Sequence, residues 1–152
     1  MRDELVVSYF KHEAMVIGTY KETLLRKDVA KLIEAARWHH CQLDLSGKLL
    51  PGDYSDLKFE FADMQHIDTR NSTAFDRCEF AHVDLSYAWM FGNSFKGAVM
   101  KDVNMDAANI SHSDLCGAHF IYVSFNRTNM FSIKRNVDTG FLCCNIKGAL
   151  HL

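Results

Sequence analysis

The chain has 152 residues, 48% of them hydrophobic, and a formal net charge of −2. This length fits one domain, and this hydrophobic content is enough for a substantial core, which excludes a disordered chain. The nearly balanced charge is not typical of a protein that binds nucleic acid directly, because such proteins carry a basic surface.

Nothing in the sequence marks the chain for a membrane or for oxidising surroundings. No apolar run is long enough to span a bilayer, and the N-terminal segment mixes charges with apolar side chains, unlike a secretory signal peptide. The five cysteines are odd in number and irregularly spaced, which argues against a disulfide framework. We therefore expect a cytoplasmic protein, with a secreted effector that lacks a cleaved signal peptide as the alternative.

The first 42 residues lack the pattern of the rest of the chain and predict one helix. Residues 5–10 and 15–20 are short apolar runs on either side of a charged stretch; they are compatible with strands, but their fold stays open. From about residue 21 to 38, apolar side chains recur at helical spacing, which predicts an α-helix. These side chains are Leu24, Leu25, Val29, Leu32, Ile33 and Ala36.

A short run of potential metal ligands, His39-His40-Cys41, follows this helix. Adjacent side chains rarely bind one ion together, and no partner follows at the spacing of a zinc site. We therefore expect no bound metal and no other cofactor.

The middle of the chain repeats every five residues. From Phe75 to Met130 every fifth residue is large and apolar, and the residue two places before each of them is small or β-branched, with Asn93 as the exception. A period of five fits neither an isolated helix nor an isolated strand, but two inward positions in five suit a narrow coil that turns a corner in every repeat. The large residues are Phe75, Phe80, Leu85, Met90, Phe95, Met100, Met105, Ile110, Leu115, Phe120, Phe125 and Met130.

This pattern resembles the pentapeptide-repeat family, whose motif is A-(D/N)-L-x-x. The cleanest copies are residues 83–86, 108–111 and 113–117. The resemblance implies a mainly β fold, a right-handed quadrilateral β-helix, with one repeat per side, about twenty residues per coil and coils stacked at roughly 4.8 Å, the strand spacing.

The motif begins earlier than its unbroken stretch, so the predicted β-helix covers residues 43–132. Residues 43–47 share the register of the later repeats, whereas residues 57–69 run one residue out of step. A one-residue loss near Pro51-Gly52 and a one-residue gain near Asn71-Ser72 would reconcile the registers, because both places carry turn residues. Residues 1–42 then form an N-terminal cap, since a solenoid needs its open end covered.

A coil of about twenty residues brings every twentieth residue onto the same face, so the outward positions can be mapped. One face carries a polar, partly acidic column that includes Asp63, Asp84 and Asp106. This acidic column is either a partner-binding site or simple turn chemistry, because the motif itself prefers Asp or Asn there. We expect the outward histidines to be ordinary solvated residues: His66, His82, His112 and His119.

The next face is aromatic instead. Trp89, Phe91 and Phe131 occupy its outward positions, with Tyr87 at the preceding corner. Exposed aromatic side chains in a cluster mark a contact surface more often than a solvated wall. The alternative is that the N-terminal segment or a loop folds over them.

The last segment, residues 133–152, is an apolar tail that includes Phe141, Leu142, Ile146 and Leu150. Residues 144–148 are a candidate last copy of the motif after a break at Lys134-Arg135. The tail serves either as a C-terminal cap or as a homodimer contact, as at the ends of several relatives in the family that the repeats resemble.

These features predict a binding protein and not an enzyme. A narrow coil filled by large apolar side chains has no cleft, and the sequence holds no Gly-rich phosphate loop, G-x-S-x-G or H-E-x-x-H motif. We expect a protein partner, and no direct contact with nucleic acid or membrane.

Two functions remain open. The resemblance implies the first: some pentapeptide-repeat proteins mimic B-DNA and bind type II topoisomerases in its place, and an inhibitor of a defence nuclease is a variant of this mechanism. Residues 43–132 suit it moderately, with twelve acidic and seven basic residues, a net charge of −5. The second is a scaffold or effector module that binds a protein through the aromatic face.

Overall fold

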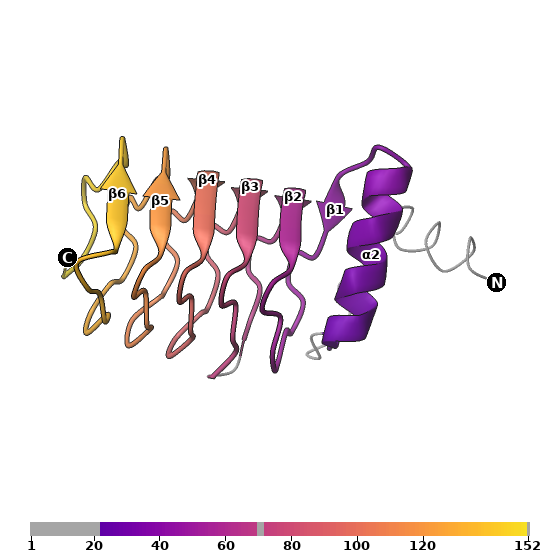
Figure 1. Cartoon of the computed structure of the whole chain (residues 1–152), viewed down its shortest axis with the longest axis horizontal. Coiled ribbons are helices and arrows are strands. Elements are labelled where there is room, and N and C mark those ends of the chain that lie inside the picture. Colours follow the sequence, from indigo (N-terminus) through magenta and orange to yellow (C-terminus); the bar gives the residue numbers. More distant parts are fainter. Residues whose placement is uncertain (1–21, 70–71, 152) are drawn as a thin grey trace.

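The chain forms a mainly β solenoid of parallel strands with one helix at its N-terminal end, in agreement with the predicted fold class. The computed structural model describes residues 22–69 and 72–151. The strands form one parallel sheet in chain order and lie side by side along the rod, beyond the helix (Figure 1). The elements are α2 (Arg26–Trp38), β1 (Leu43–Asp44), β2 (Lys58–Asp63), β3 (Glu79–Asp84), β4 (Val99–Asn104), β5 (His119–Ile121) and β6 (Gly140–Leu142).

The interior is one continuous apolar column. All twelve large residues predicted to point inward, from Phe75 to Met130, are at most 2% exposed, which confirms the predicted packing. Rings stack between successive coils, with centroids 5.0 Å apart for Phe59 and Phe80 and 5.4 Å apart for Phe75 and Phe95. The register of twenty residues per coil is what superimposes like side chains.

The coil register changes at the two places that the sequence indicated. Leu49 pairs with Asp68, nineteen residues later, whereas Asp53 pairs with Ala74, twenty-one residues later. One residue is therefore lost between Leu49 and Asp53, and one is gained between Asp68 and Ala74. From the pairing of Ala74 with Ser94 to that of Asp114 with Lys134, the period is twenty.

Asn93, the exception among the small inward residues, belongs to a buried polar seam beside the gained residue. Its Nδ2 donates to Thr69 Oγ1 at 2.7 Å, and its Oδ1 accepts the Thr73 N–H at 3.2 Å. Its own N–H donates to Ser113 Oγ at 3.1 Å. Burying these groups costs little because each is hydrogen-bonded, and among the described residues no buried side-chain nitrogen or oxygen lacks a partner.

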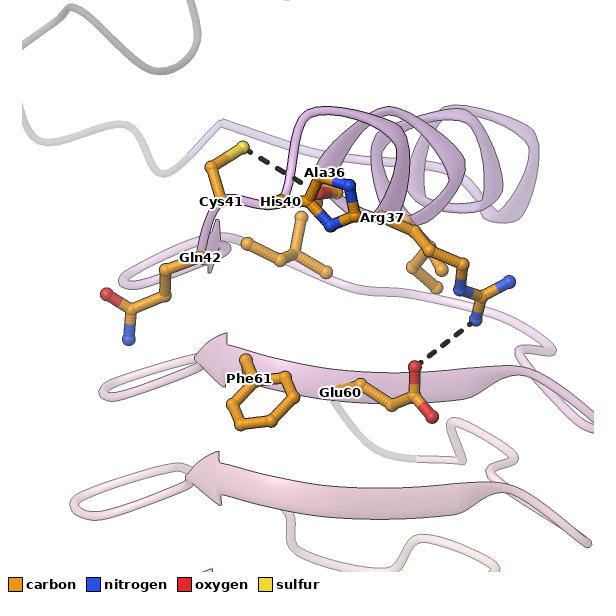
Figure 2. Close-up of a pocket in the computed structure, with 9 residues that line it drawn as sticks. Ala36, Arg37, His40, Cys41, Gln42, Glu60 and Phe61 are labelled. Carbon is orange, nitrogen blue, oxygen red and sulfur yellow. Dashed lines mark hydrogen bonds and ion pairs between the residues drawn. The ribbon is translucent and has the colours of Figure 1, made fainter.

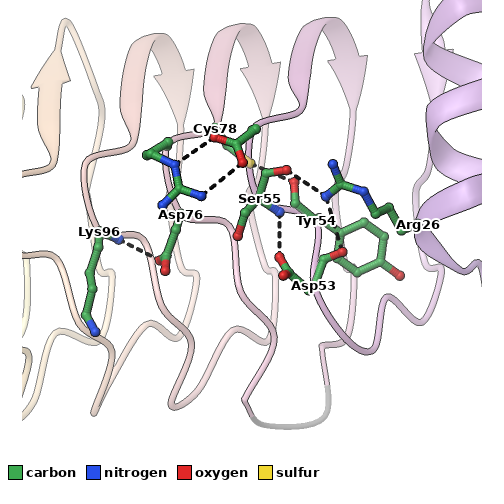
Figure 3. Close-up of polar contacts among 9 residues, drawn as sticks. Arg26, Asp53, Tyr54, Ser55, Asp76, Cys78 and Lys96 are labelled. Carbon is green, nitrogen blue, oxygen red and sulfur yellow. Dashed lines mark hydrogen bonds and ion pairs between the residues drawn. The ribbon is translucent and has the colours of Figure 1, made fainter.

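Helix α2 covers the N-terminal end of the solenoid, as Figure 3 shows for its first turn. Arg26 Nη1 donates to the carbonyl oxygen of Ser55 at 2.6 Å, and the buried Tyr54 hydroxyl donates to the carbonyl of Leu24. The helix begins later than the predicted range of 21–38 because the preceding residues are extended. Leu24 N–H donates to Leu49 O at 2.9 Å, so this segment pairs with the first coil instead. The strands considered for residues 5–20 lie outside the described residues.

The solenoid continues beyond residue 132, where the sequence analysis placed its end. Strand β6 pairs with β5, and Leu150 pairs with Asn129, so residues 133–150 form a further coil with one extra residue between Lys134 and Gly140. The inward residues of this coil are only partly covered, and Ile146 is 49% exposed. No described segment covers this end.

Candidate functional site

The four aromatic residues that the sequence assigned to one face do lie together on the surface. Tyr87, Trp89 and Phe131 are 53%, 52% and 50% exposed, and Phe91 is partly exposed. Phe91 and Phe131 both contact the ring of His112, with centroids 5.0 and 5.5 Å away. We call Tyr87, Trp89, Phe91 and Phe131 the aromatic face. No described segment buries them.

Histidines hold these rings in place, which the sequence analysis did not anticipate. His66 stacks on Tyr87, with centroids 5.1 Å apart and planes 9° apart, and His82 stacks in the same way on Phe61. Together with His112, these side chains remain exposed but pack on aromatic rings, so the expectation of ordinary solvated histidines is corrected. Their partners lie about one coil away, which explains why no local pattern showed them.

The corners that carry these side chains have a left-handed backbone. Tyr87 and His112 both have φ of +59°, and His66 has +56°, in a region that favours glycine. Each stands two residues after a large inward residue, and this recurring position is the signal that could have located the corners in the sequence.

The hydrogen bonds of the acidic column are mainly those of carboxylates that accept backbone N–H groups at turns. Asp63 and Asp84 lie in register, and the Oδ1 of each accepts the N–H two residues later, at 3.1 Å from Gln65 and 2.9 Å from Ser86. Asp106 Oδ1 instead accepts from the next coil, from Ser124 Oγ at 2.5 Å and from the Asn126 N–H at 3.0 Å. The carboxylates therefore stabilise corners, and they still place negative charge on the face that adjoins Tyr87.

The main hollow lies between α2, β1 and β2, with a volume of about 450 Å³ (Figure 2). Arg37 and Glu60 face each other across it at 3.6 Å. His40 and Cys41 also line it, but the Cys41 thiol donates to the Ala36 carbonyl, at 3.8 Å. The described residues hold no group of three or more side chains that could bind a metal ion.

Three of the thiols have raised pKa values. Burial raises the pKa of Cys78 to about 12, and burial also raises that of Cys144. The hydrogen bond to Asp114 raises the pKa of Cys116. A raised pKa keeps a thiol protonated, and only the thiolate is a good nucleophile.

Within residues 22–69 and 72–151, no helix is long and apolar enough to cross a membrane.

Comparisons with known proteins agree with the repeat and with the fold. Residues 98–132 match the family model of pentapeptide repeats (8 copies). A pentapeptide repeat protein from Nostoc Pcc 7120 superimposes with a TM-score of 0.59 at 14% identity, over 78% of this chain and 100% of that chain. Its likeness supports the fold alone.

Two further structural matches superimpose less well. The pentapeptide repeat protein Rfr23 from the cyanobacterium Cyanothece 51142 has a TM-score of 0.40 at 16% identity, over 74% of this chain and 99% of that chain. QnrB1, a plasmid-mediated fluoroquinolone resistance protein, has a TM-score of 0.36 at 12% identity, over 71% of this chain and 64% of that chain. A comparison with curated proteins finds no match. Residues 98–132 thus carry pentapeptide repeats, and the solenoid around them has the fold of known pentapeptide repeat proteins.

Proposed function

We propose that this protein is a non-enzymatic binding protein that contacts a protein partner through the aromatic face. The observation that carries the proposal is that three of its four rings are about half exposed at outward positions of a rod whose other outward residues are mostly small or polar. Contacts with His66 and His112 hold three of the four rings, so they need little further ordering on binding.

The energetic argument favours a use for these rings. An aromatic side chain buried at the centre of an interface contributes about 2 kcal/mol or more, whereas an exposed aromatic patch without a partner favours aggregation. The hollow between α2 and β2 is a weaker candidate, because the ion pair of Arg37 and Glu60 already occupies its walls.

DNA mimicry through the acidic column is the second candidate. It is supported by the register of Asp44, Asp63 and Asp84, whose carboxylates repeat from coil to coil. The charge density argues against it. At ~4.8 Å per coil, residues 43–132 span roughly 22 Å, so a net charge of −5 gives one charge per roughly 4 Å, against about 1.7 Å in duplex DNA. The linear charge density that a topoisomerase or a defence nuclease would encounter is therefore much lower than that of DNA.

Two double variants separate these functions in affinity purification from the native host, with partners identified by mass spectrometry. Trp89→Ala with Phe91→Ala removes rings and should abolish capture of the partner. Under DNA mimicry, Asp84→Lys with Asp106→Lys should abolish capture while the removal of the rings leaves it intact, and binding should weaken steeply with added salt. Trp38→Ala is the matched control, because Trp38 is 82% exposed on α2, away from this face. Normal capture by the first variant, with its fold intact, would refute the proposal.

A further inference from the structure

We propose that the aromatic face and the acidic column act as one surface that recognises a cationic, arginine-rich segment of the partner. The inference rests on the proposed function and names the chemistry of its partner. Three observations carry it: the two faces meet at one corner, a small residue follows the ring of that corner in the next coil, and the charge around it is negative.

The faces meet at Tyr87. Its N–H donates to the carbonyl oxygen of Asp106 at 3.0 Å, so the acidic residue lies in the adjacent coil beside the ring's own backbone. Asp84 opens the turn that ends at Tyr87, through the bond from the Ser86 N–H. Trp89 follows two residues later and is 52% exposed. The residues that carry two carboxylates, Asp84 and Asp106, therefore adjoin the corner that carries Tyr87.

Among the described residues, one ring stacks on Tyr87. His66 stacks on it from the preceding coil, at 5.1 Å. In the following coil the same corner position is Ala107, whose methyl group replaces a ring. On this side of the ring we therefore expect a guanidinium group of the partner to stack, as such groups do on aromatic faces.

The opposite corner of the acidic column repeats this combination. Phe61 and Tyr122 are 62% and 57% exposed there, and Asp102 occupies the same corner in the coil between His82 and Tyr122. Exposed rings thus flank the carboxylates on both sides.

The charges on this surface select a cation. The outward residues of the acidic column include Asp44, Asp63, Asp84 and Asp106. The cations near them are Lys147 in the last coil, Arg127 at the Tyr87 corner two coils away and Lys101 next to Asp102. An acidic or nucleic-acid ligand would be repelled. Arginine is favoured over lysine because its planar group stacks on a ring and binds a carboxylate at the same time, while an ammonium group is more strongly hydrated.

The test uses fluorescein-labelled nona-arginine and nona-lysine, with binding followed by anisotropy at 150 mM NaCl. The chain has two tryptophans, so the Trp38→Phe variant leaves Trp89 as the only tryptophan and its quenching reports where the peptide binds. We expect nona-arginine to bind at least about 5-fold more tightly than nona-lysine and to quench Trp89.

Substitutions test whether the preference for nona-arginine arises from the aromatic face and the acidic column. Tyr87→Leu should remove the preference for arginine while leaving charge-driven binding. Asp84→Asn with Asp106→Asn should weaken both peptides about 10-fold, and Asn is a safe replacement for Asp84 because Asn104 and Asn109 hold the same turn with their own Oδ1. The matched control is Glu79→Gln with Asp138→Asn, which removes the same charge elsewhere and should change neither affinity.

Equal affinities for the two peptides, an unchanged preference in Tyr87→Leu, or an equal loss in the control variant would overturn the inference. None of these outcomes decides the proposed function, which is tested by whether the variant Trp89→Ala with Phe91→Ala still captures the native partner. A protein that captures its partner through the aromatic face but shows no preference for nona-arginine retains the function and loses the inference.

Discussion

Single residues at the corners decide what the surface displays. A left-handed corner is easiest for glycine, yet Phe61, Tyr87 and Tyr122 hold it with φ of +50°, +59° and +53°, and all three side chains are exposed. The carboxylates beside them bind backbone N–H groups and so stabilise the turns. Residues at and beside the corners therefore both stabilise the rod and present the side chains that we propose for recognition.

The stability of the protein should fall in acid through two carboxylates at the corner next to α2. The side chain and N–H of Ser55 hold the pKa of Asp53 below its usual value, and the bidentate guanidinium of Arg77, at 2.7 and 2.9 Å, does the same for Asp56. Because both folded-state pKa values are depressed, the stabilisation is complete above about pH 4 and is lost as the pH falls through the folded values.

Thermal unfolding followed by circular dichroism between about pH 6 and pH 2.5 checks this. The melting temperature of the native protein should decline below about pH 4, and Asp53→Asn with Asp56→Asn should make that decline shallower. Both carboxylates are exposed, so the effect is modest. An unchanged slope in the double variant, with Asp138→Asn as control, would contradict the assignment.

At the scale of elements, stability comes from the repetition of one packing unit. Each strand pairs in parallel with its neighbours in chain order, so each internal coil is held by the coil before and the coil after it. The interior ring of one coil then rests on the ring of the next, as Phe95 does on Phe75. Such a stack transmits a defect to neighbouring coils, since each coil depends on both of its contacts.

Replacing Phe95 with Ala should lower the free energy of unfolding by about 3–5 kcal/mol, because it leaves a cavity where a 1% exposed ring packs. The matched control is Phe131→Ala, which removes the same ring from a half-exposed position and should cost less than about 1 kcal/mol. Urea denaturation followed by fluorescence measures both. Similar losses for the two variants would mean that the interior column does not supply the stability.

For the whole molecule, the two ends of the rod differ. Helix α2 covers the first end, whereas the last coil leaves Leu142, Ile146 and Leu150 59%, 49% and 50% exposed. An uncovered apolar end with unpaired strand edges promotes association. Because the described residues leave the C-terminal end open and cover the other, two copies that meet there form a closed dimer and not a filament.

We therefore predict a homodimer through residues 133–152, with twice the chain mass of 17.4 kDa in analytical ultracentrifugation. Ile146→Asp places a charge in the contact and should shift the protein toward monomer by about 10-fold or more in the dissociation constant. Val137→Asp is the control, because Val137 is 99% exposed in the loop before β6. A monomeric native protein at high micromolar concentration would refute the dimer.

The five-residue pattern was enough to derive the fold and much of the candidate site. It identified the inward residues from Phe75 to Met130, both early changes of register and the common face of Trp89, Phe91 and Phe131. These features depend on a period that can be recognised within neighbouring repeats, so counting residues around the coil is sufficient to place them.

Only the tertiary structure decided the contacts that form after the coil closes. The bridge between Thr23 and Leu49, the pairing of β6 with β5 and the stacking of His66 on Tyr87 all join residues in different coils. Asn93 is tolerated inside for the same reason, because its partners Thr69 and Thr73 come from the coil before. The sequence by itself determined which side chains face inward; the stacking of coils determined which outward side chains meet, because distances between coils depend on register and not on any one repeat.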